Sequence, residues 1–225
     1  MDLKNGSIYI TNNLKEAIIN IGGDSNTLNE TAKSIIGIAA ALKDMPDIER
    51  AKSLYSAADR IIAEAIDQED SICKRGCHYC CYQYIGASKT EAALIKDFIK
   101  KRNIKLSYKK LKWQSKFRQP IDYWNAYGDR TRCVFLNKDN DCDIYPVRPL
   151  TCRSYFSAML DPTFCKPDGH TDKKTMGVKS IPKVEVLISA LATFEQDKHK
   201  YPLDAKQMFY SLPALLLELK ENHEI

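Results

Sequence analysis

Eight cysteines in two blocks are the residues of this chain whose type and spacing suit chemistry. The first block reads CKRGCHYCC from residue 73, and the second is spread over residues 132–166 as CVFL, CDIYPVRPLTCR and FCKP. Thiolates are soft ligands for zinc, iron or an iron–sulfur cluster, and the sequence has no clustered carboxylates for a harder cation such as Mg²⁺. We therefore expect one metal centre with these ligands: Cys73, Cys77, Cys80, Cys81, Cys133, Cys142, Cys152 and Cys165.

A disulfide framework is the alternative interpretation of so many cysteines. Such frameworks belong mainly to small secreted proteins that cannot bury a sufficient core, whereas 225 residues, 44% of them hydrophobic, can form one or two ordinary domains. The first twenty residues lack the apolar run of a signal peptide, and no stretch approaches the roughly 18 apolar residues that a membrane span requires. We therefore expect a cytoplasmic protein with reduced thiols and no membrane association.

Cys80 and Cys81 are adjacent in the first block, which restricts how they can bind. Neighbouring side chains diverge along a helix or a strand, so both thiols reach one ion only if the backbone turns sharply between them. Otherwise they serve different metals or different edges of one cluster. Gly76 permits a tight turn before Cys77. His78 is a nitrogen donor by type, but with eight thiols in the chain we assign it a supporting or surface role.

The second block combines an irregular backbone with two cations. Pro146 and Pro149 exclude a regular helix directly after Cys142. Arg148 and Arg153 bring guanidinium groups to a centre whose thiolates are negatively charged, and a buried negative site requires such donors. We expect at least one guanidinium within hydrogen-bond reach of a cysteine sulfur or of a carbonyl in these loops. The alternative is that both arginines are surface residues.

Helices are the elements that must position the cysteines. Apolar residues recur at helical spacing over 28–42 and 48–65, and the short link through Pro46 predicts an antiparallel hairpin. Capping-box patterns begin at Thr27 and at Ser88, so a further helix starts after the first cysteine block.

The end of the chain predicts two more helices, at 184–194 and 212–219, after a polar loop at 167–183. One short strand is predicted at 7–11. The fold class is therefore mainly α, a helical domain with an irregular cysteine-rich metal-binding core. We divide it into an N-terminal helical hairpin at 1–69, a cysteine-cluster domain at 70–170, and C-terminal helices at 171–225 packed on the same domain.

Residues 96–118 carry most of the positive charge, with ten Lys or Arg and one acid, Asp97, in a chain whose net charge is +5. Lysine-rich helices are usually solvated faces with their aromatic residues turned inward, and we favour that interpretation. Attraction of phosphates or of an acidic partner is the alternative. A protein partner stays open, and we do not expect nucleic acid binding.

The order of the motifs resembles the YkgJ-like cysteine-cluster family. CKRGCHYCC is followed by SKTEA, CVFL and CDIYPVRPLTCR, over about residues 70–166. The resemblance implies a zinc- or iron-chelating domain with eight characteristic cysteines. Seven cysteines match its motifs directly, and Cys165 is assigned as the remaining downstream cysteine. The family is defined by its metal, so the resemblance implies no reaction.

An enzyme is the alternative function. Cys73, Cys77 and Cys80 have the spacing of the iron ligands in radical S-adenosylmethionine enzymes, although the chain lacks the alternating strands and helices of that barrel. Flagellin lysine N-methylases are similar to the cysteine-cluster family, which implies an iron–sulfur, S-adenosylmethionine-dependent protein-lysine N-methylase-like enzyme. That enzyme requires Cys81 turned away from the cluster and a cavity beside Tyr79. We expect instead that both blocks converge on one closed centre with no adjoining cavity.

Overall fold

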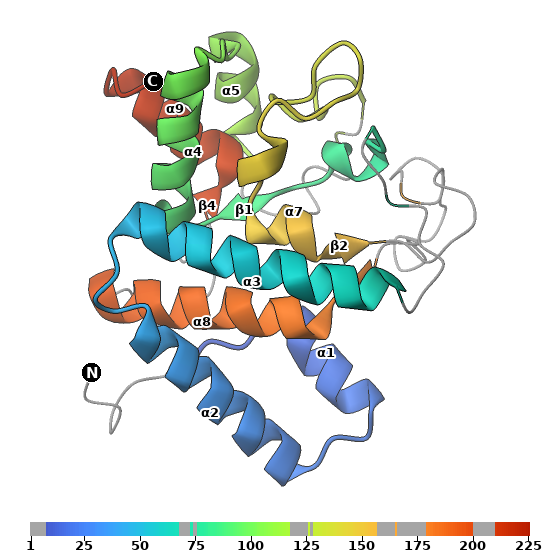
Figure 1. Ribbon diagram of the computed structural model, residues 1–225. Coiled ribbons are helices and arrows are strands. Elements are labelled where there is room, and N and C mark those ends of the chain that lie inside the picture. The colour runs from blue at the N-terminus through green and yellow to red at the C-terminus, as the bar shows by residue number, and fades with distance from the viewer. Residues whose placement is uncertain are drawn as a thin grey trace.

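Helices make up most of the structure, a computed structural model that describes residues 8–67, 73, 76–117, 126, 128–156, 165, 179–199 and 210–225. The cysteine-rich segment between the helices consists of short turns and loops (Figure 1). The predicted fold class is therefore confirmed as mainly α with an irregular cysteine-rich part. The described part of the predicted 167–183 loop, 179–183, forms the end of a short strand pair and the start of a helix, and 166–178 lies outside the described residues.

Three helices come first: α1 (Asn12–Asn20), α2 (Ser25–Ala41) and α3 (Asp47–Asp67). The link through Pro46 joins α2 to α3 as predicted, but the antiparallel hairpin expected from it is wrong, because α2 packs mainly against α8 (Pro182–His199) and not against α3 (Figure 1). The capping box predicted at Thr27 is wrong, because Asp24 caps α2 and its carboxylate accepts the Thr27 N–H at 2.9 Å. The strand predicted at 7–11 is also wrong for 8–11, because these residues form no strand and lead into α1, whose N-cap is Thr11.

The capping box at Ser88 is confirmed at the start of α4 (Lys89–Arg102), where the side chains of Ser88 and Glu91 each accept the other's backbone N–H. This helix ends at Asn103, whose φ of 51° lies in the left-handed region. The basic stretch 96–118 therefore forms two helices, α4 and α5 (Tyr108–Gln114), with a link between them.

The predicted C-terminal helices are present as α8 (Pro182–His199) and α9 (Leu212–Glu221). Figure 1 shows α8 along α3 and α2, while α4, α5 and α9 pack together at the other end of the molecule. One cluster of buried apolar residues runs through all of these helices except α1 and includes Leu54, Ile95 and Leu191. The division at 1–69, 70–170 and 171–225 stays a prediction, since residues from all three segments share this core.

Two short antiparallel strand pairs tie distant segments together. Strand β1 (Gly86–Ala87) pairs with β4 (Tyr210–Ser211), and β2 (Tyr155–Phe156) pairs with β3 (Lys179–Ser180). The cysteine loops contain three further elements: η1 (Tyr79–Tyr82), η2 (Tyr145–Val147) and α7 (Leu150–Ser154).

Within the described residues, every helix is too short or too polar to span a bilayer. The cytoplasmic location stays a prediction.

Candidate metal centre

The first cysteine block bends sharply at its adjacent cysteines. Cys80 and Cys81 lie on the 3₁₀ turn η1, and their side chains are hydrogen-bonded to one another. The sharp turn that the sequence required for a shared metal is therefore present. Gly76, just before Cys77, has φ +88°, which a residue with a Cβ rarely adopts.

Backbone contacts join the two cysteine blocks. The Cys133 N–H donates to the Cys81 carbonyl at 2.8 Å, although 52 positions separate the two residues. Beyond Cys133 the chain reverses through the predicted polar turn, where the Asn137 N–H donates to the Asp141 carbonyl at 2.9 Å. Residues Leu136 and Cys142 form an isolated β-bridge there. Pro149 is then the N-cap of α7, which carries Cys152.

Five thiols lie close enough for the charge of one to change the pKa of another. Burial, followed by the charge of Cys133, raises the pKa of the Cys142 thiol to about 12. Burial also raises the pKa of Cys152 well above its usual value, with the charges of Cys133, Cys142 and Cys80 adding to it. The pKa of Cys80 is lowered, first by the Cys81 hydrogen bond and then by the charge of Arg148, against the effect of burial. This group consists of Cys80, Cys81, Cys133, Cys142 and Cys152.

The other three thiols gather around Cys77. Burial raises the pKa of its thiol, and the charges of Cys80, Cys73 and Cys165 raise it further. Cys165 is only 4% exposed, and its carbonyl accepts a hydrogen bond from Gln83 at 3.5 Å. Both groups therefore contain cysteines from both blocks, whereas a single centre with all eight cysteines as ligands stays a prediction.

The donor set suits a thiophilic metal. All eight cysteines are free thiols in the structure. Burial and the charges of neighbouring thiols raise the pKa values of Cys133 and Cys152, and a bound metal cation would oppose this effect. Among the described residues, no three Cys, His, Asp or Glu side chains are already arranged as a coordination shell. His78 stacks on Tyr79 with ring centroids 4.7 Å apart, in keeping with a supporting or surface role.

The two arginines of the second block have different roles. Arg153 is 4% exposed, forms an ion pair with Asp59 and donates hydrogen bonds to the carbonyls of Pro146, at 2.6 Å, and Arg148, at 3.0 Å. The predicted guanidinium–carbonyl contact is therefore confirmed, and Arg153 is not a surface residue. Arg148 acts on the thiols, because its charge lowers the pKa values of Cys80, Cys142 and Cys152. Lys110 is a second such cation, because its charge lowers the pKa of Cys133.

Arg148 contacts the Tyr145 ring and acts electrostatically on the thiols. Its guanidinium lies 3.9 Å from the centroid of the Tyr145 ring. Its Nε is buried and has no hydrogen-bond partner within the described part of the chain. A buried donor without an acceptor is costly. Bound metal with its thiolates would place negative charge near this donor, which supports a neutralising role for Arg148.

Glu91 is a supporting residue whose second role the sequence did not reveal. One carboxylate oxygen accepts the Leu150 N–H at 2.7 Å and the Tyr55 hydroxyl at 3.3 Å, and the other accepts the Ser88 N–H at 2.8 Å. The capping box was visible in the sequence, but the contact with Leu150 depends on chain segments 59 positions apart. Glu91 thereby fixes the start of α7 and positions Cys152.

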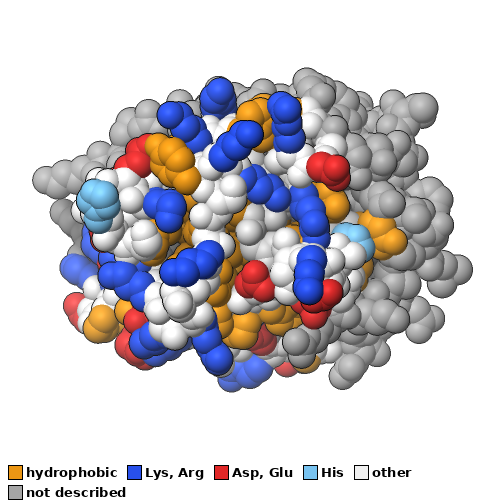
Figure 2. Space-filling view, turned by 90° about the horizontal axis from the view of Figure 1, so that it is seen from above, with side chains coloured by type: hydrophobic (Ala, Val, Ile, Leu, Met, Phe, Trp, Pro, Cys, Tyr) orange, Lys and Arg blue, Asp and Glu red, His pale blue; other side chains and the backbone are white. Residues whose placement is uncertain are grey.

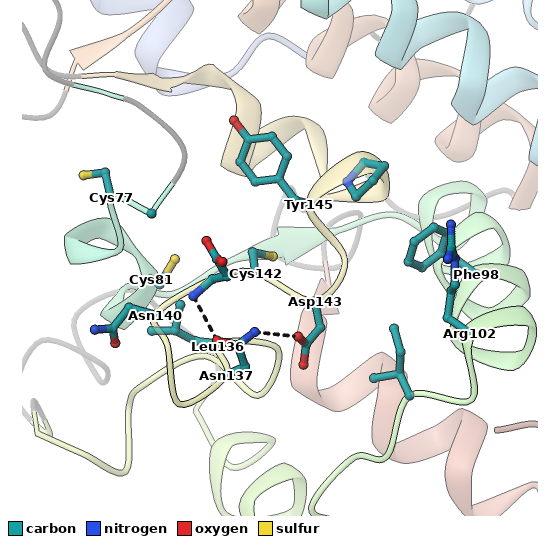
Figure 3. Close-up of a pocket in the computed structure, with 14 residues that line it drawn as sticks. Cys77, Cys81, Phe98, Arg102, Leu136, Asn137, Asn140, Cys142, Asp143 and Tyr145 are labelled. Atoms are coloured by element: carbon teal, nitrogen blue, oxygen red, sulfur yellow. Dashed lines mark hydrogen bonds between the residues drawn. The ribbon is translucent and has the colours of Figure 1, made fainter.

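A cavity of about 500 Å³ adjoins the thiols (Figure 3). Cys77, Cys81 and Cys142 line one side, and Phe98 and Arg102 of α4 line the opposite side. The expected closed centre without an adjoining cavity is therefore wrong, because α4 stands off from the cysteine loops. The conditions set for the enzyme are not met as stated, since Tyr79 is not among the residues that line this cavity and Cys81 contacts Cys80 rather than turning away from it.

Residues 72–178 match a family of domains named CxxCxxCC, described as "Putative zinc- or iron-chelating domain". We call residues 72–178 the CxxCxxCC domain, after the family that they resemble. The resemblance seen over residues 70–166 is thus confirmed, and the CxxCxxCC domain includes all eight cysteines. The match leaves 1–71 and 179–225 outside the domain. No curated protein and no solved structure matches the chain.

Proposed function

We propose that the CxxCxxCC domain binds zinc or iron through its cysteines, with iron held either as single ions or as an iron–sulfur cluster. The observation that supports this proposal is that thiols of both blocks lie close enough to change each other's pKa, although the blocks are about fifty residues apart in the sequence. The proposed ligands are Cys73, Cys77, Cys80, Cys81, Cys133, Cys142, Cys152 and Cys165.

Eight thiols exceed the four ligands of one tetrahedral ion. The five thiols around Cys80 and the three around Cys77 therefore fit two neighbouring ions or one cluster, with Cys80 between the two groups. Thiol side chains must turn to complete a shell, since no shell is formed among the described residues. Structural zinc supplies roughly 10–16 kcal/mol in small domains, which far exceeds the cost of reordering a few side chains.

The surrounding residues would support the bound metal in distinct ways. Arg148 offsets the excess negative charge of the thiolates, and Glu91 holds the helix that carries Cys152. Core residues such as Phe135, which is 1% exposed, pack close to the cysteine loops and limit the access of water to the thiols. The cavity on the Cys77 and Cys81 side leaves a route for exchange with solvent.

Metal analysis of protein purified without oxygen tests the proposal. Zinc or iron should co-purify with the chain, acid-labile sulfide should accompany iron if a cluster is present, and a brown colour should distinguish the cluster from zinc. Replacing Cys152 by serine should lower the metal content, whereas replacing His78 by alanine should leave it unchanged. Metal-free protein with intact fold and eight free thiols would refute the proposal.

The enzyme alternative has one observation in its favour, the cavity between the thiols and α4. An iron–sulfur, S-adenosylmethionine-dependent protein-lysine N-methylase would need such a space for its cofactor. Binding of S-adenosylmethionine to the anaerobic protein, measured by equilibrium dialysis, tests this alternative. If the enzyme alternative holds, the protein binds S-adenosylmethionine and the variant Arg102→Ala loses that affinity. The control is Arg130→Ala, because Arg130 does not line the cavity. Absence of binding to iron-containing protein would eliminate the alternative and leave the metal proposal intact.

A further inference from the structure

A second cavity, of about 430 Å³, lies where α4 and α9 end, and its lining contains no cysteine. Its floor is aliphatic, with Ile99 4% exposed and Ile104 and Leu106 half-buried. Its rim carries the basic residues Lys100, Lys105, Lys220 and His223. It also carries one acid, Glu224, whose carboxylate is paired with Lys96 at 2.8 Å. We call this cavity the α4–α9 groove.

The groove-lining residues within 99–106 belong to the stretch 96–118, which holds ten Lys or Arg and one acid. Figure 2 looks down on the end of the molecule where α4, α5 and α9 pack, and blue Lys and Arg side chains lie across this face with fewer red Asp and Glu side chains among them. Ion pairs join Lys96 to Glu224 and Lys101 to Asp97, each at 2.8 Å. None is found among the described residues for these exposed or half-exposed lysines: Lys100, Lys105, Lys109, Lys112, Lys116 and Lys220.

Helix dipoles account for the positions of only some of these lysines. Lys100 and Lys220 stand in the last turns of α4 and α9, where a cation offsets the negative end of the helix. Lys105 stands in the link between helices, and Lys109 stands in the first turn of α5, where the dipole disfavours a cation. Neither lysine has an ion pair among the described residues or a favourable place in a helix dipole, so both charges are accessible to an external anion.

We propose that the α4–α9 groove docks an acidic segment of a partner protein whose carboxylates meet the lysine rim and whose apolar side chains enter the aliphatic floor. Charge complementarity selects an anionic partner, and the floor selects a peptide among anionic partners. Single-stranded RNA stacks its bases on aromatic rings, but Ile99, Ile104 and Leu106 offer none. A flat anionic bilayer would meet the lysines without reaching a recessed floor.

The groove borders the thiol cavity. Ile104 lines both cavities, with Arg102 facing the thiol cavity and Asn103 facing the groove. A segment docked in the groove would thus lie beside the route to Cys77 and Cys81. The docking itself does not depend on bound metal, so its test is independent of the proposed function.

Fluorescence anisotropy with the full chain tests the docking. The probe is a labelled peptide of about 12 residues built from Glu and Leu, and the comparison peptide replaces Leu by Ser. The Glu–Leu peptide should bind more tightly than the Glu–Ser peptide, and its binding should weaken as ionic strength rises. The double variant Lys105→Glu with Lys220→Glu should weaken binding about tenfold or more. The matched control is Lys33→Glu with Lys52→Glu, two exposed lysines of α2 and α3 with the same charge change, and it should alter binding less than about twofold.

Three outcomes of this experiment would overturn the docking proposal. Equal affinity for the Glu–Leu and Glu–Ser peptides would show that the aliphatic floor is unused. Equal losses in the groove variant and in the control would show that net charge alone attracts the peptide. Tighter binding of single-stranded RNA, or of phosphatidylserine vesicles, than of the Glu–Leu peptide would assign the basic face to that partner instead.

Discussion

Replacing Glu91 by alanine removes an acceptor that three buried donors share. The Leu150 N–H, the Ser88 N–H and the Tyr55 hydroxyl all lie within 3.3 Å of its carboxylate oxygens. A buried donor left without an acceptor costs about 1–3 kcal/mol, which gives a sum of about 3–9 kcal/mol. Relief from burying the carboxylate offsets part of this sum, because burial raises the pKa of Glu91. We therefore expect a loss of about 3 kcal/mol in the free energy of unfolding.

Urea unfolding of metal-free protein measures this loss, and a zinc titration of the same variant measures its effect on the site. Metal binding should weaken together with stability, because α7 and Cys152 depend on the Leu150 contact. The control is Glu49→Ala, an exposed carboxylate paired with Lys52, which should change stability by less than about 0.5 kcal/mol. A loss below about 1 kcal/mol in Glu91→Ala, with unchanged zinc affinity, would refute the assigned role.

Three further predictions concern the site itself. Arg148→Gln should weaken metal retention about 10- to 100-fold in a chelator competition. Arg130 is exposed, and the control Arg130→Gln should retain metal as the unaltered protein does. Equal retention by the two variants would contradict a neutralising role for Arg148. Zinc binding near pH 7 should release about one proton for each coordinated thiol whose pKa is raised, because a pKa such as that of Cys142, about 12, keeps the thiol protonated without metal. Cys80, whose pKa is lowered, should release less. The affinity should therefore rise with pH, and calorimetry in buffers of different ionisation enthalpy that detects no proton release would contradict this. Asp143→Asn, at the thiol cavity, should slow zinc association about two- to fivefold at low ionic strength, because it removes a negative charge that attracts the cation. Asp139→Asn, a nearby residue that does not line the cavity, is the control and should leave the rate unchanged. Equal stopped-flow rates for the two variants would exclude entry of zinc through the thiol cavity.

Local signals in the sequence predicted the elements that local interactions determine. The Ser88 capping box, the break at Pro46 and the polar turn after Leu136 all depend on residues a few positions apart. Helix α1 was missed because its apolar face is narrow, with only Leu14 and Ile18 buried. The start of α2 was misplaced because Asp24 and Thr27 are both good caps, and the Asp24 carboxylate accepts the Thr27 N–H.

The candidate site was predictable in composition but not in arrangement. Cysteine spacing indicated which residues gather, because four thiols within nine positions have few structural uses. The placement of Cys165 beside Cys77, the contact of Glu91 with Leu150 and the cavity against α4 arise from tertiary packing between distant segments. Nothing in the local sequence encodes such contacts.

X-ray absorption at the zinc and iron edges of anaerobically purified protein tests the central claim most directly. Thiolate ligation predicts a first coordination shell dominated by sulfur, at about 2.3 Å for zinc, and this shell should lose sulfur when Cys80 is replaced by serine. A shell of nitrogen and oxygen only, or one that is unchanged after Cys80→Ser, would contradict a metal centre built from the converging cysteine blocks.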